Sequence, residues 1–178
     1  IDRALVERLL GLDFIGEGHN VLLRGPSGVA KTMLAKNLGH AALLAGYTVR
    51  FTTLAAVIGD LVQQESVPAF ERRLKRFVRP ALLIIDELGY LPSDNRAADI
   101  LYQLVNRRHE ERSVVITTNL SFKQWGGVFQ GAACVVALVD RFSQHCHRVD
   151  IDGPSWRETH PFERDDIESP RTRSRKTR

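Results

Sequence analysis

One stretch of sequence decides the fold: Val21-Leu22-Leu23-Arg24-Gly25-Pro26-Ser27-Gly28-Val29-Ala30-Lys31-Thr32. Its first three residues predict a short apolar strand, and the residues after Ala30 predict a helix. A glycine-containing loop between a strand and a helix is typical of the P-loop, in which backbone N–H groups and the helix N-terminus surround phosphate oxygens. We therefore expect nucleotide phosphates to contact the whole loop: Gly25, Pro26, Ser27, Gly28, Val29, Ala30, Lys31 and Thr32.

The last two loop residues have separate predicted roles, and Ala30 departs from the usual pattern. We expect Lys31 to reach the β- and γ-phosphates of ATP and Thr32 to offer its hydroxyl to Mg²⁺. Ala30 occupies the position where most P-loops have glycine, and its methyl group is costly if the backbone there needs a positive φ. ATP binding is therefore a firmer expectation than rapid ATP turnover.

A second motif, Leu82-Leu83-Ile84-Ile85-Asp86-Glu87, places two carboxylates after an apolar run. A fully apolar strand is typical of a parallel sheet that is covered on both faces. Asp86 is predicted to hold Mg²⁺, directly or through water, and Glu87 to polarise the attacking water. Adjacent carboxylates also occur by chance at strand ends, but the P-loop upstream favours the functional interpretation.

Two further residues follow in the order expected for a ring-forming ATPase. Asn119 ends the apolar run that starts at Val114, and we expect its amide to help orient the water; asparagine is also a common turn residue. Arg141 is a candidate for an arginine that reaches the ATP of a neighbouring subunit. The alternative for Arg141 is a surface ion pair.

The remaining pattern alternates strands with helices, which predicts a parallel α/β sheet. Strands are expected at 21–23, 48–53, 81–85, 113–118 and 148–152. Helices are expected at 1–18, 31–44, 54–79 in segments of which the second is 70–78, 94–112 and within 121–147.

Charge and composition indicate one soluble globular domain. The chain has 178 residues, of which 43% are hydrophobic, and a net charge of +4. The segment 171–178 holds five basic residues and no acid, so 20 basic and 21 acidic residues remain elsewhere. Such a tail either contacts nucleic acid or is a disordered end. The longest apolar run, 132–139, is too short to span a bilayer, so no membrane partner and a cytoplasmic location are expected.

Several residues are predicted to have no chemical role. No metal site is expected at His145-Cys146-His147, because adjacent residues point apart and a fourth ligand is missing. Arg107 and Arg108 are expected on a solvated helix face, although contact with DNA or a partner subunit is an alternative. Trp125 and Trp156 are expected to be packing residues.

Beyond the P-loop, the residue strings resemble those of IstB-type ATPases, which are transposition helper proteins of the AAA+ class related to the helicase loader DnaC. The strings lie at 11–15, 20–23, 86–92, 118–122, 125–126, 138–142 and 153–157. The most specific of them is Asp-Glu-Leu-Gly-Tyr-Leu-Pro at 86–92, because a generic strand-end carboxylate pair does not require the residues that follow.

The resemblance covers about residues 5–157, and we expect an AAA+ domain over residues 1–160. From Pro161 onward the sequence is polar and charged, so we expect a disordered tail at 161–178. The resemblance implies a five-stranded parallel sheet in the order 5-1-4-3-2. It also implies a homo-oligomer on double-stranded DNA with ATP at the subunit interfaces, and a transposase partner. Family members carry an N-terminal DNA-binding region, and since the only methionine is Met33, we expect a segment upstream of residue 1.

Three functional hypotheses remain open from the sequence. The leading one is an ATPase that assembles on DNA and regulates transposition. The second is a DnaC-like loader of the replicative helicase. The third is a degenerate remnant that binds nucleotide without hydrolysing it.

Overall fold

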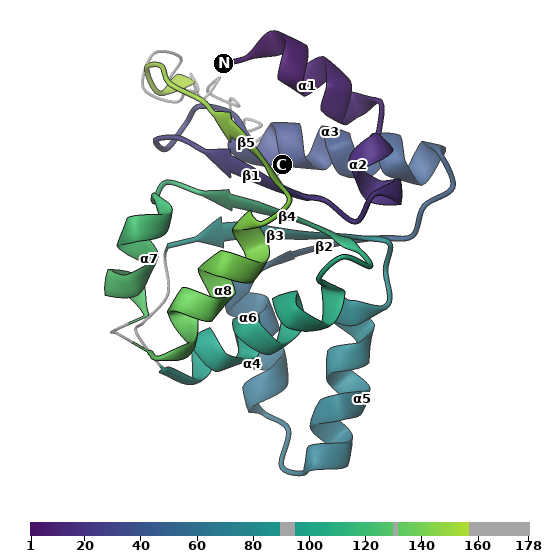
Figure 1. The fold of residues 1–178 in the computed structure, drawn as a ribbon, viewed down its shortest axis with the longest axis vertical. Helices are drawn as coiled ribbons and strands as arrows, with labels where there is room; N and C mark the ends of the chain where they lie inside the picture. Colours follow the sequence, from purple (N-terminus) through teal and green to yellow (C-terminus); the bar gives the residue numbers. More distant parts are fainter. Residues whose placement is uncertain (90–94, 130–131, 157–178) are drawn as a thin grey trace, which may run out of the picture.

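A computed structural model describes residues 1–89, 95–129 and 132–156 and places five parallel strands in one sheet (Figure 1). The strands are β1 (Asn20–Arg24), β2 (Val49–Thr53), β3 (Leu82–Leu88), β4 (Ser113–Thr118) and β5 (Cys146–Asp150). Their spatial order is β2-β3-β4-β1-β5. This is the expected order 5-1-4-3-2 read from the opposite edge, so the predicted AAA+ sheet is confirmed.

Helices cover both faces of the sheet (Figure 1). One face carries α1 (Arg3–Leu10), α2 (Asp13–Gly16) and α3 (Lys31–Leu44). The other carries α4 (Leu54–Val62), α5 (Val67–Val78), α6 (Asn95–Arg108), α7 (Phe122–Val128) and α8 (Cys134–Ser143). In the described part of the chain, no helix is long and apolar enough to cross a membrane.

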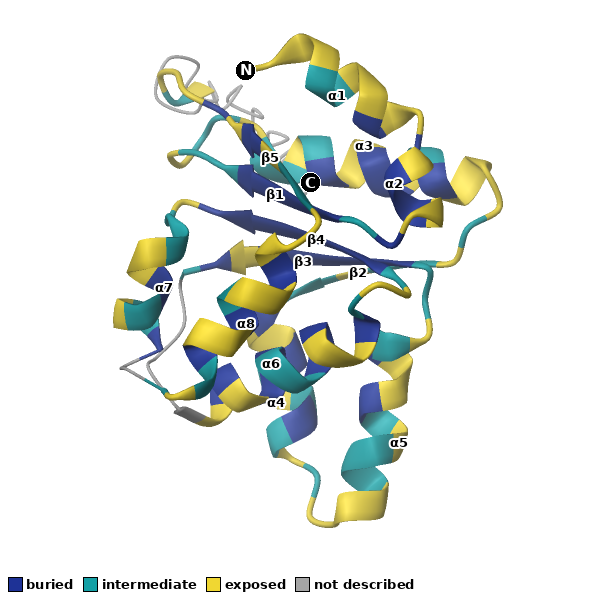
Figure 2. Cartoon of the chain, in the orientation of Figure 1, coloured by how far each residue is buried: buried dark blue, intermediate teal, exposed yellow. Residues whose placement is uncertain are grey.

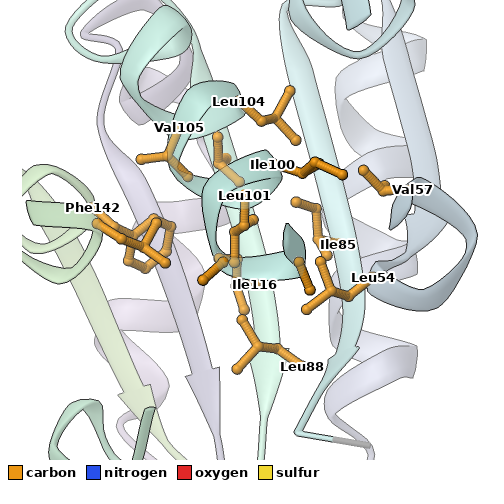
Figure 3. Packing of buried hydrophobic residues seen from close by; sticks show 14 of the residues in the cluster. Leu54, Val57, Ile85, Leu88, Ile100, Leu101, Leu104, Val105, Ile116 and Phe142 are labelled. Atoms are coloured by element: carbon orange, nitrogen blue, oxygen red, sulfur yellow. The ribbon is translucent and has the colours of Figure 1, made fainter. Parts of the chain in front are cut away.

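Burial explains why the sequences of the central strands are almost continuously apolar. Every residue of β4 is buried, and in β3 only Glu87 is exposed (Figure 2). On the face covered by α4 to α8, Leu101 of α6 and Phe142 of α8 pack over Ile85 and Ile116 of the sheet (Figure 3). Each buried side chain of this size contributes roughly 1.5–3 kcal/mol of transfer free energy.

Some boundaries differ from the sequence-based expectations. The expected helix at 1–18 is two helices, because Leu12 adopts a left-handed conformation with φ 68°. The last strand begins at Cys146 rather than 148, where the backbone N–H of Asn20 already bonds the carbonyl of His145. The expected helix start at 94 and the tail at 161–178 lie outside the described residues.

The prediction that Arg108 lies on a solvated face is wrong. Arg108 is completely buried at the end of α6. Its guanidinium donates hydrogen bonds to five backbone carbonyls, those of Phe77, Val78, Pro80, Ala81 and Ser113, at 2.7–3.2 Å. Burial, together with the charge of Arg112, lowers the pKa of Arg108 to about 9, so it keeps its charge at neutral pH. Arg108 therefore fastens the end of α5 to the starts of β3 and β4.

Arg107, by contrast, is exposed, as expected for a solvated helix face, and forms a bidentate ion pair with Glu71 of α5 at 2.6 and 2.7 Å. This pair raises the pKa of Arg107, chiefly through the hydrogen bond. The partner of Arg107 is thus a neighbouring helix of the same chain.

Candidate nucleotide-binding site

The P-loop lies where the carboxyl ends of the strands meet, which we call the carboxyl edge of the sheet, beside a cavity of about 860 Å³. This volume is within the range of typical small-molecule sites. The carboxyl ends of β1, β3 and β4 meet here, as is usual for ligand sites in open parallel sheets. The cavity is lined by Ser27, Gly28, Val29, Ala30, Lys31, Thr32, Met33, Glu87, Leu88, Thr117, Thr118, Asn119, Ile151, Asp152, Gly153, Pro154 and Trp156.

The loop backbone explains two of its residue types. Gly28 has φ 81°, and a Cβ placed on it would lie 2.1 Å from the Ser155 hydroxyl, so only glycine fits. Ala30 has φ 67° and ψ 21°, a left-handed conformation that glycine adopts without strain. The concern raised by Ala30 in the sequence is therefore realised in the structure, because its methyl group lies where the backbone needs a positive φ.

Lys31 begins α3 and points back over the loop. Its ammonium group donates to the carbonyls of Gly25 at 2.8 Å and Pro26 at 2.6 Å. These bonds hold a positive charge above the loop, at the edge of the cavity, where phosphate oxygens would meet it.

Asp86 is buried and shares one carboxylate oxygen between two hydroxyl donors. Thr32 donates to Asp86 Oδ1 at 3.0 Å, and Thr117 donates to the same oxygen. The two residues predicted to hold Mg²⁺ thus lie together although 54 positions separate them. Thr32 lines the cavity and bonds to Asp86, and a hydroxyl and a carboxylate are the hard oxygen ligands that Mg²⁺ prefers, so these residues fit that ion.

Glu87 leaves the sheet at a β-bulge. Its φ is 63°, and the pairing register between β3 and β4 shifts between Ile85 and Leu88. The backbone N–H of Glu87 donates to the Thr117 hydroxyl at 3.0 Å. The bulge exposes this side chain and makes it part of the cavity wall, while its neighbour Asp86 stays buried.

Asn119 also lines the cavity, directly after β4. A Cβ placed on Gly89 would lie 2.8 Å from Asn119 Oδ1, so glycine allows the end of β3 to approach this amide. The Thr118 hydroxyl donates to the Leu88 carbonyl at 2.6 Å and accepts from the N–H of Leu120 at 3.0 Å. These contacts hold Asn119 and Glu87 on the same wall.

Arg141 does not join the other predicted residues. It is exposed in the last turn of α8 and is not among the residues that line the cavity. Within its own chain, Arg141 therefore lies outside the cavity.

Two residues of the site were not singled out from the sequence. Thr117 bonds both Asp86 and Glu87, and its only sequence signal is a hydroxyl two positions before Asn119. Trp156, expected to be a packing residue, is 65% exposed and lines the cavity, and its backbone N–H donates to the Gly28 carbonyl at 3.1 Å. The prediction for Trp125 is confirmed, because that side chain is fully buried.

Comparison with protein families gives a match over residues 1–163 to a family described as IstB-like ATP binding protein. A predicted ATP-binding protein of insertion sequence IS21 from Pseudomonas aeruginosa is 39% identical over 157 residues, which are 88% of this chain and 59% of that protein. A similarly named protein of insertion sequence IS5376 from Geobacillus stearothermophilus is 35% identical, over 88% of this chain and 62% of that protein. The chain thus spans about three fifths of the length of these relatives.

Solved structures show the same fold at low identity. DnaI superposes with a TM-score of 0.70 at 18% identity, over 87% of this chain and 84% of that chain. The DnaC helicase loader superposes with a TM-score of 0.66 at 19% identity, over 83% of this chain and 86% of that chain. Domain III of the replication initiation protein DnaA from Thermotoga maritima has a TM-score of 0.68 at 18% identity, over 86% and 65% of the two chains.

Proposed function

Because the chain belongs to the IstB-like ATP-binding protein family, we propose that it hydrolyses ATP with Mg²⁺, assembles on duplex DNA and acts with a transposase. The observation that carries the proposal is the arrangement around Asp86, whose buried carboxylate accepts from Thr32 while Glu87 and Asn119 line the adjoining cavity. A site that bound nucleotide passively would have no use for the second carboxylate and the amide on that wall.

The residues divide the work of phosphoryl transfer among them. Lys31 and the loop N–H groups bind the phosphates, and Thr32 and Asp86 would hold Mg²⁺, which neutralises charge on the β- and γ-phosphate oxygens when bound. Glu87 polarises a water molecule on the side of the γ-phosphate, and Asn119 orients that water. The Thr117 hydroxyl fixes the backbone of Glu87 and the carboxylate of Asp86 at once.

The position of Arg141 supports assembly into an oligomer. This exposed cation lies on α8 outside the cavity of its own subunit. Supplied to a neighbour's ATP, an arginine of this kind accelerates hydrolysis roughly 10³–10⁵-fold. The ATP hydrolysis rate per subunit should then increase with protein concentration. Arg141→Ala should abolish that increase while leaving ATP affinity unchanged.

The exposed face of α5 supports the DNA-binding part of the proposal. Arg72, Lys75, Arg76 and Arg79 are all exposed within or directly after this one helix. Cations spaced along one face can neutralise several backbone phosphates without reading the sequence. The basic tail at 171–178 is the second possible contact.

The ATPase is tested by comparing the wild type with Glu87→Gln, Lys31→Ala and the exposed control Glu111→Gln. Glu87→Gln should lower turnover roughly 10²–10⁴-fold while ATP still binds, because only the general base is lost. Lys31→Ala should lower ATP binding, and Glu111→Gln should change neither quantity. Equal turnover in wild type and Glu87→Gln would contradict the proposal and favour a nucleotide-binding remnant.

The DNA contact is tested by measuring duplex affinity as a function of salt. Loss of one phosphate contact lowers the slope of log K against log salt by roughly 0.9. The pair Arg72→Glu and Arg76→Glu should flatten the slope if α5 binds, and deletion of 171–178 should do so if the tail binds. An unchanged slope in both variants would exclude both surfaces.

A further inference from the structure

A cluster of imidazoles lies at the amino ends of the strands, which we call the amino edge of the sheet, away from the nucleotide cavity. His19 directly precedes β1, and His147 pairs in register with Val21 from the neighbouring strand β5. Glu17 ends α2 two residues before His19. Since β1 runs from residue 20 to 24, His19 is about 20 Å from the start of the P-loop at roughly 3.3 Å per residue, and His147, beside Val21, about 13 Å.

The side chains of Glu17, His19 and His147 converge on one point. Their ligand atoms all lie within 4.8 Å of one another. Glu17 Oε2 and His19 Nδ1 are already 3.0 Å apart. Ligands of a tetrahedral metal ion with bonds of about 2.0–2.2 Å are about 3.4 Å apart, so the longest separation must close by about 1.5 Å or less. Glu17 is exposed, so its side chain can adjust toward the two imidazoles.

The backbone that carries these ligands is held firmly. The N–H of Asn20 donates to the His145 carbonyl at 2.7 Å, and the Asn20 side chain donates to the Phe142 carbonyl at 3.1 Å. Gly18 has φ 68°, and a Cβ there would lie 2.9 Å from the Glu110 backbone, so this loop packs against Glu110 in a way that only glycine permits. Ligands on such a frame are oriented before an ion binds.

Further groups orient the rings and set the local charge. The His145 ring stacks on His19 with centroids 5.2 Å apart and 13° between the planes. Glu110 lies 3.7 Å from both His109 and His145. Burial lowers the pKa of His147, with help from the charges of His19 and Arg8. Arg8 is the one fixed cation among these groups, and it opposes the binding of another.

We propose that Glu17, His19 and His147 form a binding site for a divalent transition-metal ion such as Zn²⁺, with water completing the coordination. Two imidazoles and one carboxylate are a ligand set that zinc accepts, whereas Mg²⁺ prefers oxygen ligands alone. The ion would join the α2–β1 loop to β5 and so stabilise the amino edge of the sheet. The residues could not be grouped from the sequence, since Glu17 and His19 are 128 or more positions from His147.

Cys146 is not part of the proposed site, although it lies between two histidines. Cys146 packs against the core on the opposite side of the strand, and burial raises the pKa of its thiol to about 12. His147 lies on the strand and His145 in the turn just before it, and both of their rings lie beside His19. The missing ligands come from the α2–β1 loop rather than from the same strand.

The test is isothermal titration of the chain, free of any histidine tag, with ZnCl₂ in excess Mg²⁺. The wild type should bind one Zn²⁺ at this site, and the ion should raise the melting temperature until a chelator removes it. His19→Ala, His147→Ala and Glu17→Gln should each weaken binding tenfold or more. Arg8→Gln should strengthen it, because the opposing charge is gone.

Control variants separate this site from the other histidines and from the P-loop. His40→Ala lies on α3, and His160→Ala lies outside the described residues; both should bind Zn²⁺ like the wild type. Lys31→Ala should also keep zinc binding, so failure of the ATPase proposal would not affect this result. If His147→Ala fails to fold, Glu17→Gln decides, because that side chain is exposed. No zinc binding by the wild type, or equal losses in His40→Ala and Glu17→Gln, would overturn the proposal.

Discussion

The two edges of the sheet both bury polar side chains, but these side chains bond to different partners. At the carboxyl edge, Asp86 and Thr117 bond to each other and to groups that line a cavity. At the amino edge, Arg108 and Asn20 bond to backbone atoms of neighbouring elements, and Ser113 donates to the Phe14 carbonyl at 2.9 Å. The fully buried polar groups of the amino edge, as distinct from the half-buried and exposed zinc ligands, therefore stabilise the fold, whereas the buried polar groups of the carboxyl edge adjoin a ligand cavity.

The largest effect should come from Arg108→Met at the amino edge. This variant keeps the volume but leaves up to five buried carbonyls without their donor, which should lower the free energy of unfolding by about 3–5 kcal/mol. Chemical denaturation measures the loss, and ATP affinity of the folded fraction should not change. The control Arg107→Met removes a partly exposed ion pair and should cost far less. Equal losses in the two variants would contradict a structural role for the buried arginine.

The next largest effect should come from Lys31→Ala at the carboxyl edge. This variant should lose ATP affinity and keep its stability, whereas Arg108→Met should lose stability and keep its ATP affinity. Loss of a charged hydrogen-bond donor to the phosphates costs about 1.5–3 kcal/mol of binding, or roughly 10- to 150-fold in ATP affinity. The melting temperature without nucleotide should stay close to that of the wild type. Lys36→Ala, an exposed lysine of the same helix, is the matched control and should bind ATP normally. A large loss of stability in Lys31→Ala would break the proposed division between the edges.

Thr117→Val tests whether a buried hydroxyl at the carboxyl edge contributes more to turnover than to ATP affinity. The hydroxyl of Thr117 donates to Asp86 and accepts from the Glu87 N–H, and valine keeps the shape while removing both bonds. We expect a stability loss of about 1–2 kcal/mol and a loss of turnover larger than the loss of ATP affinity. Steady-state kinetics and nucleotide titration separate the two quantities. Thr52→Val, whose hydroxyl bonds only the next carbonyl, should leave both unchanged.

The sequence predicts the carboxyl edge far better than the amino edge, for a physical reason. Phosphate binding requires consecutive residues at fixed spacing, so the P-loop and Asp86-Glu87 are visible in one dimension. The partners of Arg108 are 5–31 positions away and are carbonyls, which every residue has, so no side-chain pattern marks them. The zinc ligands and Trp156 are likewise assembled only by the fold. A helix end that depends on a single backbone angle, such as the one at Leu12, is not visible in the sequence either.

The smallest effect tests Ala30, a residue at the carboxyl edge whose backbone conformation lowers stability. Ala30 has φ 67°, a left-handed conformation that costs an alanine about 1–2 kcal/mol. Ala30→Gly removes this cost but adds about 0.4–1 kcal/mol of unfolded-state entropy, so the free energy of unfolding should rise by about 1 kcal/mol or less. Ala41→Gly, in the interior of the same helix, should lower it by about 1 kcal/mol.

The opposite signs of these two identical substitutions make the test independent of glycine's general effect on helices. Denaturant unfolding without nucleotide measures both. If Ala30→Gly destabilises the protein as Ala41→Gly does, the loop conformation at Ala30 is not strained, and slow turnover could not be traced to it. If it stabilises the protein while turnover rises, the methyl group limits the site through the backbone rather than through contact with the phosphates.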